Sequence, residues 1–227
     1  MAQNLPSVSI DVGQSDNPEN LSNIVQIVIL LTLLSLAPAI LILVTSFTRI
    51  IIVLSLLRHA LSTQQIPPNQ VLVGLALFLT FFIMYPVFVE VNDTAIQPYM
   101  AEEIDQSVAL ENAVVPIRTF MLKHVRQKDL ALFLNVAGQP RPANQAEVST
   151  RVLIPAFVIS ELRIAFQMGF MLFIPFLIID MVVASILMSM GMMMLPPIMV
   201  SLPFKILLFV LVDGWNILIQ SLVASFQ

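Results

Sequence analysis

Long apolar segments alternate with one polar segment along the 227 residues of the chain. No charged residue occurs between residues 21 and 48, and apolar residues continue to residue 57. As a single helix, residues 21–57 would be about 55 Å long, against about 30 Å for the hydrocarbon core of a bilayer. Pro38 lies within this segment. We therefore expect a membrane-embedded helix that is kinked or split at the proline.

A second uncharged segment runs from residue 60 to residue 89, and its first part, residues 62–69, has the composition of a turn. This pattern predicts a helix over about residues 70–90. Arg49, Arg58 and His59 separate the two apolar segments, and basic residues in a short connection mark the cytoplasmic side of a membrane. The region after residue 90 and the polar tail, residues 1–20, should then lie on the opposite side. Residues 21–91 form the first hydrophobic helical pair.

Residues 92–151 contain most of the ionisable side chains. Helical patterns cover residues 102–115 and 118–133, and a loop rich in glycine and proline follows at residues 138–142. The mixed signs of the charges are typical of a solvated helix face. We predict a small helical extramembrane domain.

Residues 152–227 are apolar again, but charges and prolines interrupt them. The charges are Glu161, Arg163, Asp180, Lys205 and Asp213. The prolines are Pro155, Pro175, Pro196, Pro197 and Pro203. No stretch provides about 20 apolar residues without a charge or a helix breaker. The pattern predicts helical hairpins packed against protein rather than two ordinary lipid-facing helices.

Charged side chains at membrane depth cost at least about 2.5–3.5 kcal/mol each, so each of these five needs protein or water around it. Glu161 and Arg163 are two positions apart and do not face each other on a helix. Lys205 and Asp213 would lie about 12 Å apart along a helix axis. Three arrangements remain open: ion pairs within one chain, a pair between Glu161 and Lys205 of neighbouring subunits, and a proton pathway through Asp180.

Small residues recur at helical spacing in the same region. Ala165 and Gly169 are four positions apart, and so are Ser185 and Ser189. Such spacing lets helix backbones approach closely in membranes. The pattern favours burial of these faces against other helices.

Residues 188–197, MSMGMMMLPP, form the most distinctive local sequence. Gly191, Pro196 and Pro197 predict a hairpin turn. The candidate pore residues in it are Met190, Met192, Met193 and Met194. Methionine is flexible and apolar, so several copies could close a pore and still yield to an irregular chain. The alternatives are gaps filled between helices and Cu(I) capture by thioethers, although no Cys or His lies nearby.

The composition agrees with a membrane protein. Hydrophobic residues make up 58% of the chain and charged residues 11%, against about 25% charged in soluble domains. The net charge of −4 excludes a typical nucleic-acid binder, and the absence of cysteine excludes disulfides and thiolate metal sites. His59 and His124 lack catalytic companions, and no phosphate-binding or hydrolase motif occurs. We expect no enzyme activity, cofactor or metal.

Several blocks of the sequence resemble the FliP family of the flagellar type III export gate and, more distantly, the SctR proteins of virulence injectisomes. These blocks are residues 45–53 (TSFTRIIIV), 67–72 (PPNQVL), 155–162 (PAFVISEL), 166–170 (FQMGF), 175–185 (PFLIIDMVVAS), 191–197 (GMMMLPP), 202–205 (LPFK) and 212–215 (VDGW). The resemblance covers nearly everything after residue 21. The N-terminal tail and the middle domain are its weaker parts.

The resemblance implies an all-α membrane subunit that assembles into a helical ring, a pentamer, with FliQ and FliR and beside FlhA and FlhB. The complex lies in the bacterial inner membrane within the flagellar basal body and extends into the periplasm. Its channel passes unfolded flagellar subunits, with Met192, Met193 and Met194 as a gasket and Glu161 and Lys205 tying subunits together.

The resemblance also bears on the start of the chain. Family precursors carry a cleavable signal peptide, whereas Ala2 and Gln3 look like a processed start behind an added Met1. We therefore expect this sequence to be the mature form.

Three other functions stay open on the sequence: an injectisome homologue, a proton-coupled transporter that uses Asp180, and a purely structural membrane scaffold. A transporter of this class often shows internal repeats. The two halves of this chain differ instead, because the first is free of charges over long stretches and the second is not.

Overall fold

The computed structural model describes residues 18–227 except residues 64, 141, 143, 145–146 and 193–194. The described residues divide into two units, with the division between Ile40 and Leu41. The described residues form helices and no strand, so the prediction of an all-α membrane protein is confirmed. The helices are α1 (Pro18–Leu43), α2 (Phe47–Ala60), α3 (Asn69–Val91), the π-helical turn η1 (Asn92–Ile96), α4 (Gln97–Met100), α5 (Gln106–His124), α6 (Gln127–Val136), α7 (Thr150–Ser189), α8 (Pro197–Leu211) and α9 (Gly214–Ala224).

The first apolar segment breaks at residues 44–46 and not at Pro38, which lies inside α1. The hydroxyl groups of Thr45 and Thr48 both donate to the carbonyl oxygen of Ile42, at 3.3 Å. These bonds provide a partner for a carbonyl group at the helix end, which has none within the helix. The helix therefore ends where threonine hydroxyl groups bind one of its last carbonyl groups, and Pro38 stays within α1.

The second apolar segment forms α3, close to the predicted residues 70–90, with Pro86 inside the helix. The helical conformation continues through η1 and α4, so residues Asn69–Met100 are one candidate membrane span. Where α3 ends, the predicted boundary with the middle domain is not marked by a break in the helix.

Besides η1 and α4, residues 92–151 contain α5 and α6 where two helices were predicted, and the boundary between these two differs from the prediction. Pro116 lies inside α5, and the chain turns at Val125 and Arg126, whose backbones are extended. The backbone N–H of Arg126 donates to the hydroxyl oxygen of Ser160 at 3.0 Å, and this hydroxyl donates to Asp129 Oδ2 at 2.8 Å. A contact with α7 thus holds the turn in place.

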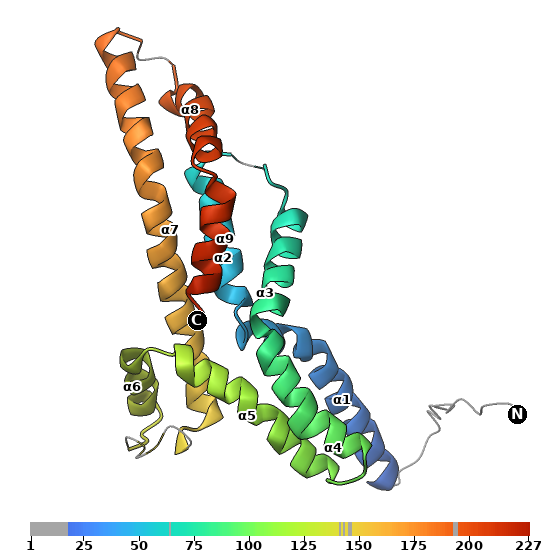
Figure 1. Ribbon diagram of the computed structural model, residues 1–227. Helices are drawn as coiled ribbons and strands as arrows, with labels where there is room; N and C mark the ends of the chain where they lie inside the picture. The colour runs from blue at the N-terminus through green and yellow to red at the C-terminus, as the bar shows by residue number, and fades with distance from the viewer. Residues whose placement is uncertain (1–17, 64, 141, 143, 145–146, 193–194) are drawn as a thin grey trace, which may run out of the picture. The chain divides into compact units, whose positions relative to one another are not determined.

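The 40-residue helix α7 corrects the prediction that prolines interrupt the last third throughout. Pro155 and Pro175 both lie inside α7, and the helix contains a window apolar enough to cross a membrane. A proline inside a helix removes one hydrogen bond, at about 3 kcal/mol. Packing offsets that loss, because α2, α5, α6 and α8 all contact α7 (Figure 1).

Helices α8 and α9 meet at a bend of 65°. Asp213 occupies the bend in the left-handed conformation, with φ of 52°, which Asp adopts more readily than most residues. Gly214 follows because a Cβ atom there would lie 2.2 Å from Cδ2 of the Phe209 ring. The bent pair counts as a third candidate membrane span.

Candidate functional site: two ion pairs and a methionine turn

The first buried ion pair joins α2 to α7. Arg49 Nη2 lies 2.5 Å from Glu161 Oε1, and Arg49 Nε donates to Glu161 Oε2 at 2.9 Å. The geometry is bidentate, with two parallel hydrogen bonds that fix both side chains. Arg49 is 1% exposed and Glu161 is 0% exposed. Each charge therefore depends on the other for its compensation.

The helices come close enough for this pair because small residues line the crossing. Ala165 and Gly169 of α7 are buried, and α2 is the helix with which α7 has its most extensive contact. A Cβ atom on Gly169 would lie 2.2 Å from Cδ1 and 3.1 Å from Cβ of Leu56. The predicted burial is confirmed for Ala165 and Gly169, whereas Ser185 and Ser189, for which it was also predicted, are exposed.

Arg49 also holds the end of α9. Its Nη1 donates to the carbonyl oxygen of Ser225 at 2.8 Å and to the hydroxyl oxygen of Ser225 at 2.9 Å. Its Cζ lies 3.8 Å above the centroid of the Phe226 ring, a cation–π contact. One guanidinium group therefore joins three elements: α2, α7 and the segment after α9.

An aromatic cluster surrounds this junction. The His124 ring lies 4.7 Å from the Phe120 ring and 5.3 Å from the Phe226 ring, centroid to centroid. Burial, together with the positive charges of Arg49 and Lys123, lowers the pKa of His124 from 6.5 to about 4. His124 is therefore neutral at pH 7, where it packs as an aromatic ring.

The second ion pair joins α8 to α7. Lys205 Nζ lies 2.6 Å from Asp180 Oδ2, and it also donates to the Ser62 hydroxyl at 2.6 Å and to the Ala60 carbonyl at 3.2 Å. The other carboxylate oxygen of Asp180 accepts a hydrogen bond from the Ser201 hydroxyl at 2.6 Å. Lys205 is 1% exposed, whereas the side chain of Asp180 is 33% exposed, so this ion pair is only partly buried.

In the described part of the methionine segment, α7 ends in a turn at residues 190–192 and α8 begins at Pro197. The N–H of Gly191 donates to the Met188 carbonyl and that of Met192 to the Leu187 carbonyl, which is the Schellman arrangement at a helix end. Gly191 has φ of +73°, the conformation this motif requires. Met190 and Met192 are exposed. The predicted pore residues Met193 and Met194 lie outside the described residues.

Comparison with known proteins places these features in a family. The FliP family model matches residues 30–222 of the chain. The chain is 60% identical over 217 residues to the flagellar biosynthetic protein FliP of Bacillus subtilis (strain 168), which covers 96% of this chain and 98% of that protein. The chain belongs to the FliP family.

Two further FliP proteins have similar coverage. The flagellar biosynthetic protein FliP of Pectobacterium carotovorum subsp. carotovorum is 58% identical over 202 residues, or 89% of this chain and 78% of that protein. The protein of the same name from Aquifex aeolicus (strain VF5) is 50% identical over 225 residues, or 98% of this chain and 92% of that protein. The resemblance found in the sequence is confirmed.

In this FliP-family chain, the predicted charged residues divide into two groups. Glu161, Asp180 and Lys205 are paired within the chain, which is the intramolecular alternative left open above. The contact between Glu161 and Lys205 of neighbouring subunits stays a prediction. Arg163 is exposed, and Asp213 is an exposed turn residue whose carboxylate accepts a hydrogen bond from Asn216 at 3.0 Å.

The two basic residues assigned to the cytoplasmic side also differ from each other. Arg58 lies in the last turn of α2 and donates to the Asn69 side chain at 2.6 Å, beside the connection to α3. Arg49 is instead buried in the first turn of α2, so it does not belong to a connecting loop. The sequence reading missed its role as the partner of Glu161. The only local signal was a lone arginine flanked by apolar residues.

Proposed function

We propose that this chain is the channel-forming subunit of the flagellar type III protein export gate. In this proposal several copies, a pentamer by family resemblance, assemble in the bacterial inner membrane with FliQ and FliR and near FlhA and FlhB. The channel between them passes unfolded flagellar subunits, and residues 92–151 lie on the periplasmic side. The membership of the chain in the FliP family supports the flagellar assignment.

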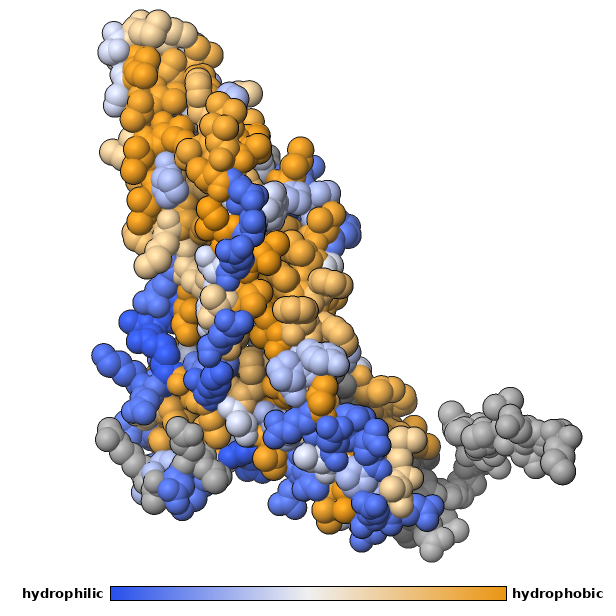
Figure 2. All heavy atoms as spheres, viewed as in Figure 1, coloured by the Kyte–Doolittle hydropathy of each residue, from blue (hydrophilic) through white to orange (hydrophobic). Residues whose placement is uncertain are grey.

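The observation that carries the proposal is the large apolar surface left uncovered around the α7–α8 turn. On the face in Figure 2, hydrophobic residues dominate this part of the protein, whereas hydrophilic residues gather over α5 and α6. Exposed apolar side chains on α7 and α8 include Phe170, Met171, Leu177, Met181, Ile186, Met199, Leu207 and Leu211. So much exposed apolar surface needs lipid or partner subunits to cover it.

The methionine turn supports the channel assignment. Met190 and Met192 project from a turn that offers no core for them to fill, and both are exposed. Unbranched thioether side chains adapt to irregular neighbours. Several copies of this turn around an axis would form a soft collar that seals a channel at rest and yields to an extended polypeptide.

The proposal predicts a leak when the collar is removed. Replacing Met190, Met192, Met193 and Met194 together by Ala should let ions and small solutes cross membranes that contain the assembled complex, because Ala is too short to close the gap. Uptake of a small fluorescent solute by cells or proteoliposomes measures this. If the complex assembles and the membrane stays impermeable to the solute, the methionines do not seal the channel.

The matched control replaces exposed methionines outside the turn. Met171 and Met181 of α7 are 72% and 62% exposed, similar to Met190 at 66%. Their replacement by Ala should leave the membrane tight. A leak from this control as large as that from the turn variant would indicate a general defect in assembly and would contradict the gasket.

A further inference from the structure

Charge is distributed unevenly over residues 90–151. Residues 90–117 contain six acidic residues and no Lys or Arg, whereas residues 118–151 contain six Lys or Arg and two acidic residues. Helix α5 connects the two parts, and its 19 residues span about 27 Å. This segment therefore has an acidic end, at η1, α4 and the start of α5, and a basic end, at the last turn of α5 and α6.

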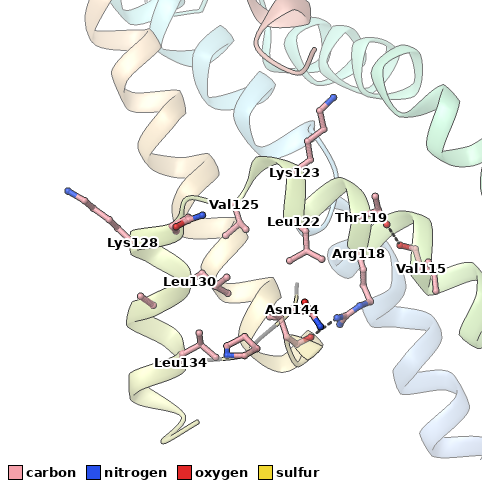
Figure 3. Close-up of a pocket in the computed structure, with 14 residues that line it drawn as sticks. Val115, Arg118, Thr119, Leu122, Lys123, Val125, Lys128, Leu130, Leu134 and Asn144 are labelled. Atoms are coloured by element: carbon pink, nitrogen blue, oxygen red, sulfur yellow. Dashed lines mark hydrogen bonds between the residues drawn. The ribbon is translucent and has the colours of Figure 1, made fainter. Parts of the chain in front are cut away.

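The basic end contains a hollow between α5, α6 and the residues Pro142, Asn144 and Val148, with a volume of about 1180 Å³ (Figure 3). Leu122 and Leu130 point into it, while Lys123 and Lys128 extend away from its mouth. Arg118 also lines the hollow, but its guanidinium donates to the Val148 carbonyl at 2.5 Å and to the Thr150 hydroxyl. Among the described lining residues, Lys123 and Lys128 are thus exposed cations that an approaching surface would meet.

The acidic end carries the complementary features. We define the acidic knob as residues 96–111, which form α4, the following turn and the start of α5. Met100 is 78% exposed and Leu110 is 62% exposed. Glu102 and Glu103 are exposed beside Met100. The knob therefore presents apolar side chains among carboxylates, whereas the hollow has leucine side chains inside it and the exposed residues Lys123 and Lys128 in its lining.

We propose that the hollow of one copy of this chain receives the acidic knob of a second copy. Within one copy the length of α5 separates the two surfaces, so they cannot satisfy each other. The two surfaces differ, which makes the contact heterologous, and a heterologous contact repeated around an axis closes a ring or builds a helix. Complementary charge would set the orientation and register of the copies. The inference rests on the proposed function in one respect, since both require several copies.

The chain contains no cysteine, so introduced thiols report this contact without background. Gln127 is exposed at the rim of the hollow, and Met100 lies on the knob. In membranes with the full complex, a short bis-maleimide should link the variant with both Met100→Cys and Gln127→Cys into dimers and a ladder of larger species. Each single variant should stay unlinked. A dimer formed by Gln127→Cys alone would indicate a symmetric contact and overturn the proposal.

Charge exchange provides the second test. Lys123→Glu with Lys128→Glu should reduce the cross-link by about tenfold, and Glu102→Lys with Glu103→Lys should do the same, because like charges then face each other. All four changes in one chain should restore much of the yield. Failure of this restoration, with each pair of changes tolerated by the fold, would contradict a direct contact.

A control cysteine position and a measurement of the copy number test this inference independently of the proposed function. Leu132 is exposed on α6 but does not line the hollow, so Met100→Cys with Leu132→Cys should link far less. Native mass spectrometry of the extracted complex gives the copy number. A ring of several copies without the link between positions 100 and 127 would overturn this contact and leave the export gate intact. A monomer would overturn both.

Discussion

The two halves of α7 have the same secondary structure and nearly opposite surroundings. Eight of the eleven buried residues of α7 lie at or before Gly169, and they include Ser160 and Glu161. After Gly169 only Phe176, Val183 and Leu187 are buried. In the first half the charged side chain of Glu161 is enclosed, although Arg151 and Arg163 are exposed, whereas many apolar residues of the second half are exposed. The hydrophobicity of a residue therefore does not by itself determine whether the residue is buried in this chain.

The difference follows from which elements cover each half. Helices α2, α5 and α6 and the end of α9 meet at the first half, and the ion pair of Arg49 with Glu161 lies at their junction. The second half has α8 as its partner in the hairpin, with the pair of Asp180 and Lys205 between them. The first half completes its packing within one chain. The exposed apolar residues of the second half need lipid or another subunit to cover them.

Removing one charge of the enclosed pair should produce the largest effect. Glu161→Gln leaves the Arg49 guanidinium buried without its counter-charge, and breaking a buried pair in this way costs about 3–5 kcal/mol. We expect a large decrease in the thermal unfolding midpoint of the purified chain in detergent. Arg163→Gln, at an exposed position on the same helix, should change stability by no more than about 0.5 kcal/mol.

A double variant sharpens this test. Arg49→Met with Glu161→Leu removes both charges and should recover a large part of the stability that Glu161→Gln loses, since the penalty arises from the unpaired charge. If the double variant is less stable than Glu161→Gln, the contacts of Arg49 with Ser225 and Phe226 matter more than its ion pair.

A smaller effect is expected from filling the helix crossing in the first half. Gly169→Ala places a methyl group against Leu56, and overpacking of this kind costs about 1–3 kcal/mol. Gly74 of α3 is a matched control, because no atom lies within 4 Å of a Cβ atom built there. Gly74→Ala should be neutral or stabilise the helix by up to about 1 kcal/mol. Equal effects of the two changes on the unfolding midpoint would contradict close packing at Gly169.

The sequence predicted those features that depend on neighbouring residues. The helix expected over residues 70–90 is α3. A long apolar segment that follows turn residues favours a helix, so local sequence was sufficient to predict it. Gly191 and the two prolines after it fixed the end of α7 and the start of α8. The need of Glu161 and Lys205 for partners also followed from local composition, because charge in an apolar segment requires compensation.

Features that depend on residues far apart in the sequence could not be predicted from it. Arg49 is 112 residues from Glu161, and nothing near either residue identifies the other as its partner. The turn at Arg126 depends on a hydrogen bond to Ser160, 34 residues away, so the local pattern placed the boundary near Pro116 instead. In both cases the packing of α7 against the rest of the chain selected the structure.

Leu177 of the second half should show the smallest effect on the single chain, and its buried neighbour Phe176 serves as the comparison. Phe176 is 5% exposed and Leu177 is 54% exposed. Phe176→Ala removes a buried ring and should destabilise the chain by about 3–5 kcal/mol. Leu177→Ala should change the unfolding free energy of the single chain in detergent by no more than about 0.5 kcal/mol.

The amount of assembled complex then shows whether a partner subunit or lipid covers Leu177. If a partner subunit covers Leu177, Leu177→Ala should lower the fraction of chains in the extracted complex, because apolar area buried in the contact is lost. If lipid covers it, that fraction should stay unchanged, because an alanine contacts acyl chains much as a leucine does. A loss of single-chain stability as large as that from Phe176→Ala would mean that the second half packs within its own chain, and the contrast between the halves would then be wrong.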